Sequence, residues 1–373
     1  MDNFNNIKKE IDNIVWIIPI RKLRYSLRNY LTKLIEDNNL IKLQNNFILK
    51  KIYNNINDDK IINYNEEKSD FILNYNKINN NYKKQCVFYL GSNAGFYSEL
   101  NNMVLGILYC LVNKIQFKLY SKTANFSSSG LGWEEFFIPF CNQTDEDMHS
   151  LFNGRSINKS LEEYNYLKKL YNIDYMVYDI WGNIRSKNFK KSFFYIEELG
   201  IKGNLRESVG LILKNIYRFN YNTKKEINTL IKSVNLPNKY IAAHIRSGDK
   251  IIECNLINYR QYMEIIQKYT DIKDLFIFTD DYTIIENIKK YYNEYNIFTL
   301  TNKNEKGYVL DELNSKSNKE KHNELIKLFA MVEISYKSEL CFGSYTTNPS
   351  MFISAMMEKD RFIEVDSLDF DIY

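Results

Sequence analysis

Short apolar runs alternate with longer segments whose apolar residues recur at helical spacing. A buried strand reads as a continuous apolar run, and an amphipathic helix as apolar residues three or four positions apart. Strands that alternate with helices predict an α/β fold with parallel sheets. The predicted strands are residues 85–90, 117–120, 240–245, 274–279, 296–300 and 339–344. The predicted helices are residues 99–111, 161–171, 208–234, 259–269, 282–292, 324–335 and 351–357.

The alternation of predicted strands and helices divides the chain into three regions. The 373 residues are enough for two domains with their own cores. Residues 1–84 are rich in Asn and Lys and are predicted to be an amphipathic arm and a linker. Residues 85–236 are predicted to form a first α/β domain, and residues 237–373 a second, Rossmann-like domain that begins at Pro237.

The N-terminal arm carries an apolar run, residues 14–20, followed by basic residues. Such a patch is typical of a contact with an anionic membrane surface, here through residues 1–35. A plain helix packed on the protein body is the alternative. The run is far shorter than the ~20 residues that span a bilayer, and acidic residues before it argue against a signal peptide. We therefore expect a cytoplasmic protein with a possible peripheral membrane contact.

Charge and cysteine content exclude several classes of function. The net charge of +4 is too small to indicate a nucleic-acid partner. The five cysteines are scattered without a Cys-x-x-Cys pair, which fits a reducing compartment and predicts neither disulfides nor a zinc site. Residues 145–147 and 369–371 match the Asp-x-Asp of metal-dependent glycosyltransferases as strings. Neither follows an apolar strand, so we interpret both as solvated acidic loops and expect no metal.

The strongest chemical signal is the end of the strand at residues 240–245. Open α/β folds bind ligands where a strand ends in a polar turn. Arg246 offers a flat fork of donors to a phosphate, Lys250 adds a charge, and Glu253 can accept a proton. His244 lies at the end of the strand itself. The alternative is a strand edge with an ordinary surface Arg–Asp pair.

Two other turns precede helices. Residues 91–97 hold two glycines before the helix at 99–111, and residues 345–350 are rich in hydroxyl groups before the helix at 351–357. Free N–H groups at a helix start favour phosphate. For the second turn, simple N-capping by Thr or Ser is the alternative.

These motifs resemble those of the α1,6-fucosyltransferases and their bacterial nodulation relatives, in the wider group of protein O- and α1,2-fucosyltransferases. Residues 244–250, His-Ile-Arg-Ser-Gly-Asp-Lys, are similar to the family's His-x-Arg-Arg-x-Asp-Lys. Residues 278–281 are similar to its Thr-Asp-Asp, and residues 343–348 to its Ser-rich turn. A looser match runs from residue 93 to the Gly-Trp-Glu at 132–134. The resemblance covers roughly residues 85–140 and 239–358.

The resemblance implies an inverting, metal-independent enzyme of the GT-B type, with two Rossmann-like domains facing a cleft and GDP-fucose as donor, without a cofactor. The first domain would be the acceptor side and the second would bind the nucleotide sugar. The implied catalytic residues are Glu253 as general base, Arg246 on the diphosphate, and Asp249 and Lys250 shaping the site. The implied donor-binding residues are His244, Arg246, Lys250, Tyr262, Thr346, Thr347, Gly95, Phe96 and Tyr97, the last three closing over the donor. Asp280 and Asp281 would position sugar or acceptor hydroxyls.

The sequence departs from the family pattern at several positions. Ser247 replaces the second Arg, Tyr97 replaces a Gly, and Lys250 lies one residue closer to Glu253. The family's His pair is replaced by Asn101 and Asn102. Its Asp that recognises the nucleotide has no clear match, with Glu324 and Glu333 as candidates. The leading hypothesis is fucosyl transfer from GDP-fucose to a glycan or lipid-linked sugar. The alternatives are another nucleotide-sugar donor, or a catalytically silent nucleotide- or glycan-binding homologue.

Overall fold

The structure is a computed structural model that describes most of residues 69–366. The gaps in this range are residue 93 and residues 158–159, 248–256 and 308–315, and outside it only positions 27, 29, 31, 33 and 370 are described. Glu67–Asp145 and His149–Tyr373 form one compact unit, separate from Met1–Glu66 with Glu146–Met148. The two parallel sheets found among the described residues both lie in the former unit. The predicted membrane-contacting arm falls almost wholly outside the described residues and stays a prediction.

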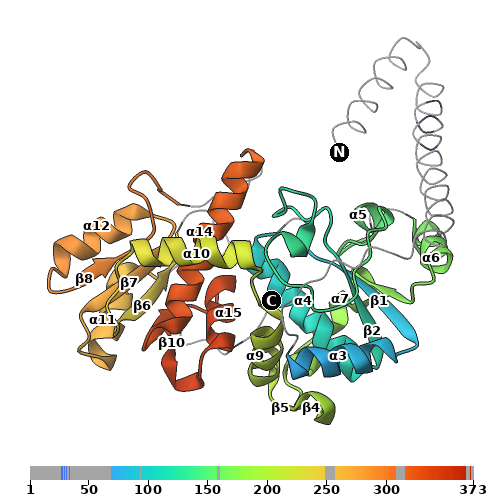
Figure 1. The fold of residues 1–373 in the computed structure, drawn as a ribbon, viewed down its shortest axis with the longest axis horizontal. Helices are drawn as coiled ribbons and strands as arrows, with labels where there is room; N and C mark the ends of the chain where they lie inside the picture. Colours follow the sequence, from blue (N-terminus) through green and yellow to red (C-terminus); the bar gives the residue numbers. More distant parts are fainter. Residues whose placement is uncertain are drawn as a thin grey trace. The chain divides into compact units, whose positions relative to one another are not determined.

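The first half of this unit is built on a parallel sheet of order β2-β1-β3. Its strands are β1 (Lys84–Tyr89), β2 (Ile115–Tyr120) and β3 (Tyr175–Met176). Helix α4 (Phe96–Val112) connects β1 to β2 and is apolar almost all round. A helix of that kind belongs inside a core, and α4 is buried along nearly its whole length. Helices α6 (Leu161–Leu170) and α7 (Val177–Ile184) lie before and after β3 in the chain, and both helices are labelled in Figure 1.

Part of the predicted linker is a helix, which corrects that prediction. Helix α3 (Asp70–Asn80) buries Ile72, Tyr75 and Asn79, which share one face because they are three or four residues apart. The Asn79 side chain accepts a hydrogen bond from the backbone of Phe117 at 2.8 Å and donates one back at 2.9 Å. An asparagine thus anchors α3 to β2, although the Asn-rich composition pointed to a loop.

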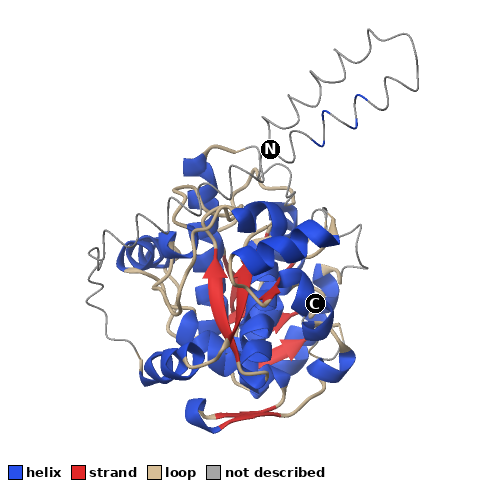
Figure 2. Cartoon of the chain, turned by 90° about the vertical axis from the view of Figure 1, so that its right-hand side faces the viewer, coloured by secondary structure: helices blue, strands red, loops and turns tan. Residues whose placement is uncertain are grey.

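The middle of the chain also differs from the predicted run of helices. Strands β4 (Phe194–Ile196) and β5 (Ile201–Gly203) form an antiparallel hairpin that lies apart from both parallel sheets (Figures 1 and 2). The single helix predicted at 208–234 is two helices, α9 (Leu205–Ile216) and α10 (Tyr221–Ser233). The break comes at Asn220, whose side chain caps α10 by accepting from Thr223 N–H at 3.0 Å.

The second half holds a parallel sheet of order β10-β9-β6-β7-β8. Together the two sheets confirm the predicted α/β class, and helices enclose the strands (Figure 2). The strand order reverses at β6, because β7 and β8 lie on one side and β9 and β10 on the other. Ligands of open α/β sheets bind at such a switch point, outside the carboxyl ends of the strands. The strands are β6 (Ile241–Ile245), β7 (Asp274–Thr279), β8 (Asn296–Phe298), β9 (Cys341–Gly343) and β10 (Phe362–Glu364). The helices are α11 (Tyr259–Tyr269), α12 (Tyr282–Tyr291), α14 (Asn318–Lys337) and α15 (Asn348–Met356).

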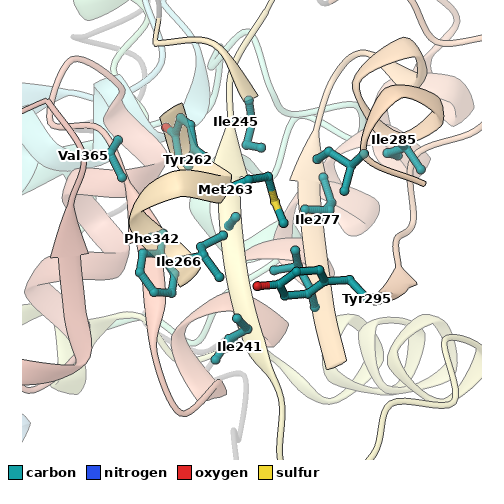
Figure 3. Close-up of a cluster of buried hydrophobic side chains, with 13 residues drawn as sticks. Ile241, Ile245, Tyr262, Met263, Ile266, Ile277, Ile285, Tyr295, Phe342 and Val365 are labelled. Carbon is teal, nitrogen blue, oxygen red and sulfur yellow. The ribbon is translucent and has the colours of Figure 1, made fainter. Parts of the chain in front are cut away.

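The core of this second sheet fixes where β6 ends. Ile241, Ala243 and Ile245 point to one face and are buried, as expected for alternate residues of a strand. Met263 and Ile266 of α11 pack against them (Figure 3). Each such large apolar side chain contributes roughly 1.5–3 kcal/mol by burial. The polar residues that follow Ile245 therefore begin at a well-defined edge of the sheet.

The two halves are joined by an aromatic seam of side chains that are almost all buried. Tyr97 and Tyr217 share a hydrogen bond between their hydroxyls at 2.7 Å. Phe96 of α4 lies 4.9 Å from Phe329 of α14, measured between ring centroids. The members of the seam are Phe96, Tyr97, Phe137, Tyr217, Phe219, Phe329 and Phe352. These contacts hold the starts of α4 and α15 close together.

Candidate active site

Arg246 and Asp280 meet where β6 and β7 end. The two strands are parallel, with Ile245 opposite Thr279, so the residues after them are neighbours. The Arg246 guanidinium donates to the Asp280 carboxylate, and the Ser247 N–H donates to the other carboxylate oxygen at 2.8 Å. Both charged side chains are 17% exposed. Asp280 thus orients the guanidinium and the start of the loop that follows β6.

Asp281 caps a helix, which was not predicted from the sequence. One carboxylate oxygen accepts from the N–H and the hydroxyl of Thr283 at 2.9 and 2.7 Å. The other accepts from the Ser247 hydroxyl at 3.3 Å. An aspartate with this geometry is an ordinary N-cap, here of α12. Both oxygens accept hydrogen bonds inside the protein, and the expected positioning of sugar or acceptor hydroxyls stays a prediction.

His244 is buried and connects β6 to the start of α15. Its Nδ1 lies 2.7 Å from the Ser350 hydroxyl and 3.3 Å from that of Thr347, and its ring stacks on Phe278 at 4.1 Å. Burial, with the positive charge of Arg246, lowers the pKa of His244 to about 3. The imidazole is therefore neutral, and it supports the switch point between β6 and β9.

The hydroxyl-rich turn after β9 is already satisfied in large part by a carboxylate. Asp366, just past β10, accepts from the Ser344 hydroxyl at 2.5 Å and from the Thr346 N–H at 3.2 Å. The Thr347 hydroxyl donates to the Ser344 carbonyl at 3.0 Å. Pro349, in the first turn of α15, supplies no N–H. Part of the turn is therefore already engaged by Asp366, which was not among the predicted residues, and the donor-binding role of Thr346 and Thr347 stays a prediction. The strand before Asp366, β10, was not predicted from the sequence, so the strand-end rule did not draw attention to this residue.

The loop before α4 surrounds the buried carboxylate of Glu99. Glu99 is 2% exposed and accepts from the N–H groups of Gly91 and Ala94 at 3.1 and 3.2 Å. Arg155 donates to it at 2.6 Å. Gly91 has φ +83°, and a Cβ there would lie 2.6 Å from that of Ala124, so only glycine fits. Two N–H groups of the loop before α4 are thus already used by this carboxylate.

Other sequence-predicted residues lie inside the protein. Phe96 and Tyr97 are 4% and 2% exposed within the aromatic seam, and their expected closure over the donor stays a prediction. Gly95 stands at the N-cap of α4 without a side-chain bond, and its role stays a prediction. Tyr262 is buried and donates to the His244 carbonyl at 2.8 Å, so it supports β6.

The replaced family positions have structural partners. The Asn101 amide donates to the Asn348 carbonyl at 3.1 Å and so bridges α4 and α15. Asn102 accepts from Arg185 at 3.2 Å. Both candidate nucleotide-recognising glutamates lie on α14: Glu324 pairs with Lys316 at 3.0 Å, and Glu333 with Lys337 at 2.7 Å.

The remaining catalytic predictions fall outside the described residues. Asp249, Lys250 and Glu253 belong to the segment at 248–256, so their roles stay predictions. Within the described part of the chain, no group of three or more His, Cys, Asp or Glu side chains is arranged to hold a metal ion. In the same part, no helix combines the length and apolar character that crossing a membrane requires.

Comparison with known proteins finds similar solved structures only. No protein-family model matches the sequence, and no curated protein matches it. The chain is similar to a crystal structure of fucosyltransferase NodZ from Bradyrhizobium, with 13% identity over 76% of this chain and 96% of that one, and a TM-score of 0.47. It is similar to NodZ alpha-1,6-fucosyltransferase soaked with GDP-fucose, with 12% identity over 74% and 93%, and a TM-score of 0.45. It is also similar to POFUT1 in complex with GDP, with 11% identity over 75% and 98%, and a TM-score of 0.39.

Proposed function

We propose that this chain is an inverting, metal-independent glycosyltransferase that transfers fucose from GDP-fucose to a hydroxyl of a glycan or lipid-linked sugar. The observation that carries the proposal is the guanidinium of Arg246, oriented by Asp280 at the switch point of the second sheet. This is where an open α/β fold binds the phosphates of a nucleotide. The order of the sequence motifs along the chain supports the same assignment.

Arg246 would stabilise the leaving group. When the bond between the sugar and GDP breaks, negative charge develops on the diphosphate. A preorganised cationic donor placed there lowers the barrier without metal. Asp280 contributes by holding the guanidinium plane before the donor arrives, so little reorganisation is needed during the reaction.

Glu253 is the proposed general base. It would take the proton of the acceptor hydroxyl while the oxygen attacks the anomeric carbon opposite the departing GDP. One carbon–oxygen bond forms as the other breaks, so the configuration inverts. Lys250 would add positive charge at the diphosphate, and Asp249 would shape the loop.

The first experiment identifies the nucleotide-sugar donor. Binding of GDP, UDP and their sugars to the full chain is measured by thermal shift and calorimetry, followed by donor hydrolysis and transfer to glycan acceptors. We expect GDP and GDP-fucose to bind most tightly and fucose to be transferred. Tightest binding of a UDP-sugar would indicate another transferase, and binding without turnover would indicate a silent homologue. Absence of all nucleotide binding overturns the proposal.

A further inference from the structure

The outward side of the β4–β5 hairpin carries two exposed aromatic side chains. Phe193, just before β4, is 67% exposed, and Tyr195 within β4 is 62% exposed. Of the phenylalanines in the described part of the chain, Phe193 is the only exposed one. The hairpin lies apart from both parallel sheets (Figure 2). Single exposed apolar residues need no explanation, but large ones gathered on one face are a feature of binding surfaces.

The register of the hairpin separates this outward side from a buried one. Phe194 lies opposite Gly203. Tyr195 lies opposite Lys202. Opposite residues of an antiparallel pair point to the same side of a sheet, and successive residues point to opposite sides. Phe194 and Ile201 are accordingly buried on the inner side, while Tyr195 and Lys202 are exposed together on the outer side. Folding of the hairpin depends on the inner side and does not require the outer one.

The same stretch of chain is rich in lysine. Helix α8 (Lys187–Lys190) comes directly before the hairpin, and its Phe189 ring lies 5.3 Å from the ring of Phe194, measured between centroids. This contact holds α8 beside β4. Residues 187–202 contain four lysines and two glutamates, so their charge is positive on balance. The exposed lysines are Lys187, Lys191 and Lys202. The glutamates are Glu197 and Glu198, in the short connection between the two strands.

Exposed aromatic rings beside lysines fit the surface of an anionic bilayer. Aromatic rings settle at the level of the lipid headgroups, where one end of the side chain is apolar and the other is wet. Lysines near such a surface are attracted by the charge of anionic lipids. Interfaces between proteins are also rich in aromatic residues but are poor in lysine. The charge of this stretch therefore favours a lipid surface over a protein partner.

We propose that the outward side of the hairpin docks on a bilayer that contains anionic lipid. This surface, called the hairpin face, consists of Phe193, Tyr195, Lys187, Lys191 and Lys202. It is distinct from the N-terminal arm, for which the sequence predicts a membrane contact of its own. The docking itself does not depend on the proposed function. Where that function holds, the hairpin face favours a lipid-linked sugar over a free glycan as acceptor, because such a substrate is anchored in the same bilayer.

Binding of the full chain to vesicles measures the contribution of the two rings. Phosphatidylcholine vesicles with and without phosphatidylserine serve as probes, and we expect tighter binding with phosphatidylserine that weakens as salt is raised. Phe193→Ser combined with Tyr195→Ser should weaken this binding about 10-fold or more, as for loss of buried apolar surface. Tyr269→Ser combined with Tyr291→Ser, at exposed positions of the second half, is the matched control. Melting temperatures check that all variants are folded.

Replacing the lysines separates charge from apolar contact. Lys187→Gln, Lys191→Gln and Lys202→Gln together should lower the affinity for phosphatidylserine vesicles about 10- to 100-fold, since each lysine near an anionic surface contributes about fivefold. Affinity for pure phosphatidylcholine should not change. The control replaces three exposed lysines on α11 and α12, Lys268, Lys289 and Lys290. Equal binding of the wild-type chain to both kinds of vesicle would overturn the role of anionic lipid.

A tryptophan reporter locates the contact directly. Phe193→Trp adds one tryptophan to the three of the chain, and lipids brominated on their acyl chains quench tryptophans that enter the bilayer. We expect stronger quenching of Phe193→Trp than of the wild-type chain. Tyr221→Trp, exposed at the start of α10, should show no such increase.

The outcomes distinguish the hairpin face from other occupants and from the proposed function. Absence of added quenching at position 193 overturns the inference even where the chain binds vesicles, because the N-terminal arm then makes the contact. Unchanged binding by the double serine variant, or no vesicle binding by the wild-type chain, also overturns it. Self-association of the wild-type chain that the serine variant loses overturns it by identifying a second copy as the occupant. A wild-type chain that docks on vesicles but binds no GDP-fucose ends the proposed function and leaves the docking in place.

Discussion

The guanidinium of Arg246 lies against the carboxylate of Asp280, 34 positions later in the sequence. The pair exists because β6 and β7 are parallel neighbours with Ile245 opposite Thr279. Each residue alone is an ordinary polar side chain after a strand. Together they form an oriented cation at the edge of the sheet, the position at which open α/β folds generally bind their ligands.

Replacing Arg246 tests the role of that cation. Arg246→Ala should lower the transfer rate about 10²- to 10³-fold, or ~3–4 kcal/mol of barrier, as for loss of a preorganised donor. Arg246→Lys should retain only part of the wild-type transfer rate, because an ammonium lacks the planar fork of donors. Steady-state kinetics measure both. Arg260→Ala, at an exposed position on α11, should leave the rate unchanged. Retention of most activity by Arg246→Ala would remove the basis of the proposed mechanism.

Replacing Glu253 separates binding from chemistry. Glu253→Gln should bind GDP-fucose like the wild-type chain but turn over about 10²- to 10⁴-fold more slowly, the usual contribution of a general base. Calorimetry and single-turnover kinetics measure the two effects. Glu264→Gln, on the exposed face of α11, is the matched control. If Glu253→Gln keeps its rate, the base is another carboxylate, and Asp249 and Asp280 are the next to test.

Chelation tests the metal-independent mechanism. We expect the transfer rate to be unchanged in EDTA, because Arg246 and Lys250 are proposed to carry the charge that a metal would otherwise supply. The same assay with added Mg²⁺ and Mn²⁺ checks for activation. Loss of activity in EDTA, restored by a divalent cation, would direct attention to the acidic segment at 145–147.

Two buried histidines make stability depend on pH. Burial lowers the pKa of His149 and of His244 from 6.5 to about 3. Below pH 6.5 the unfolded chain binds protons that the folded chain does not, so the free energy of unfolding falls as pH falls. The slope approaches about 1.4 kcal/mol per pH unit for each histidine. Urea unfolding between pH 7 and 5 measures it, and His149→Gln should reduce the slope. A pH-independent stability in this window would contradict the prediction.

The contact between α9 and α15 depends on a glycine. A Cβ at Gly210 would lie 2.3 Å from the Ala355 carbonyl oxygen, so Gly210→Ala should destabilise the fold by about 1–3 kcal/mol through overpacking. Gly182 in α7 has open space around its Cβ position. Gly182→Ala should therefore stabilise by about 0.5–1 kcal/mol, the helix preference of Ala over Gly. Chemical denaturation of both variants provides the comparison, and equal effects would show that the close approach is unimportant.

Local patterns predicted most of the regular structure, because strands and amphipathic helices each show a characteristic spacing of apolar residues over short stretches of sequence. Tyr259–Tyr269 and Asp274–Thr279 appear with the predicted bounds. Helix α3 was missed because its buried face includes Asn79, a polar residue that is satisfied only by the distant backbone of Phe117.

The site was harder to predict because its partners are distant in sequence. The sequence placed Arg246, Asp280 and Ser344 at strand ends correctly. It could not show that Glu99 fills the glycine loop or that Asp366 occupies the turn after β9. Both carboxylates accept from N–H groups of the loops that precede the two helices, and only the folded chain shows that these donors are already used.

The aromatic seam has a consequence for how a substrate enters. Each aromatic side chain buries roughly 150–250 Å², or about 4–6 kcal/mol at ~25 cal/mol per Å². Wetting even half of the surface of the rings that join α4, α14 and α15 would cost more than the ~8 kcal/mol gained from a micromolar ligand. A ligand of that affinity therefore cannot supply the free energy needed to part α4 from α14 and α15 at this seam, so these helices stay together when a ligand binds.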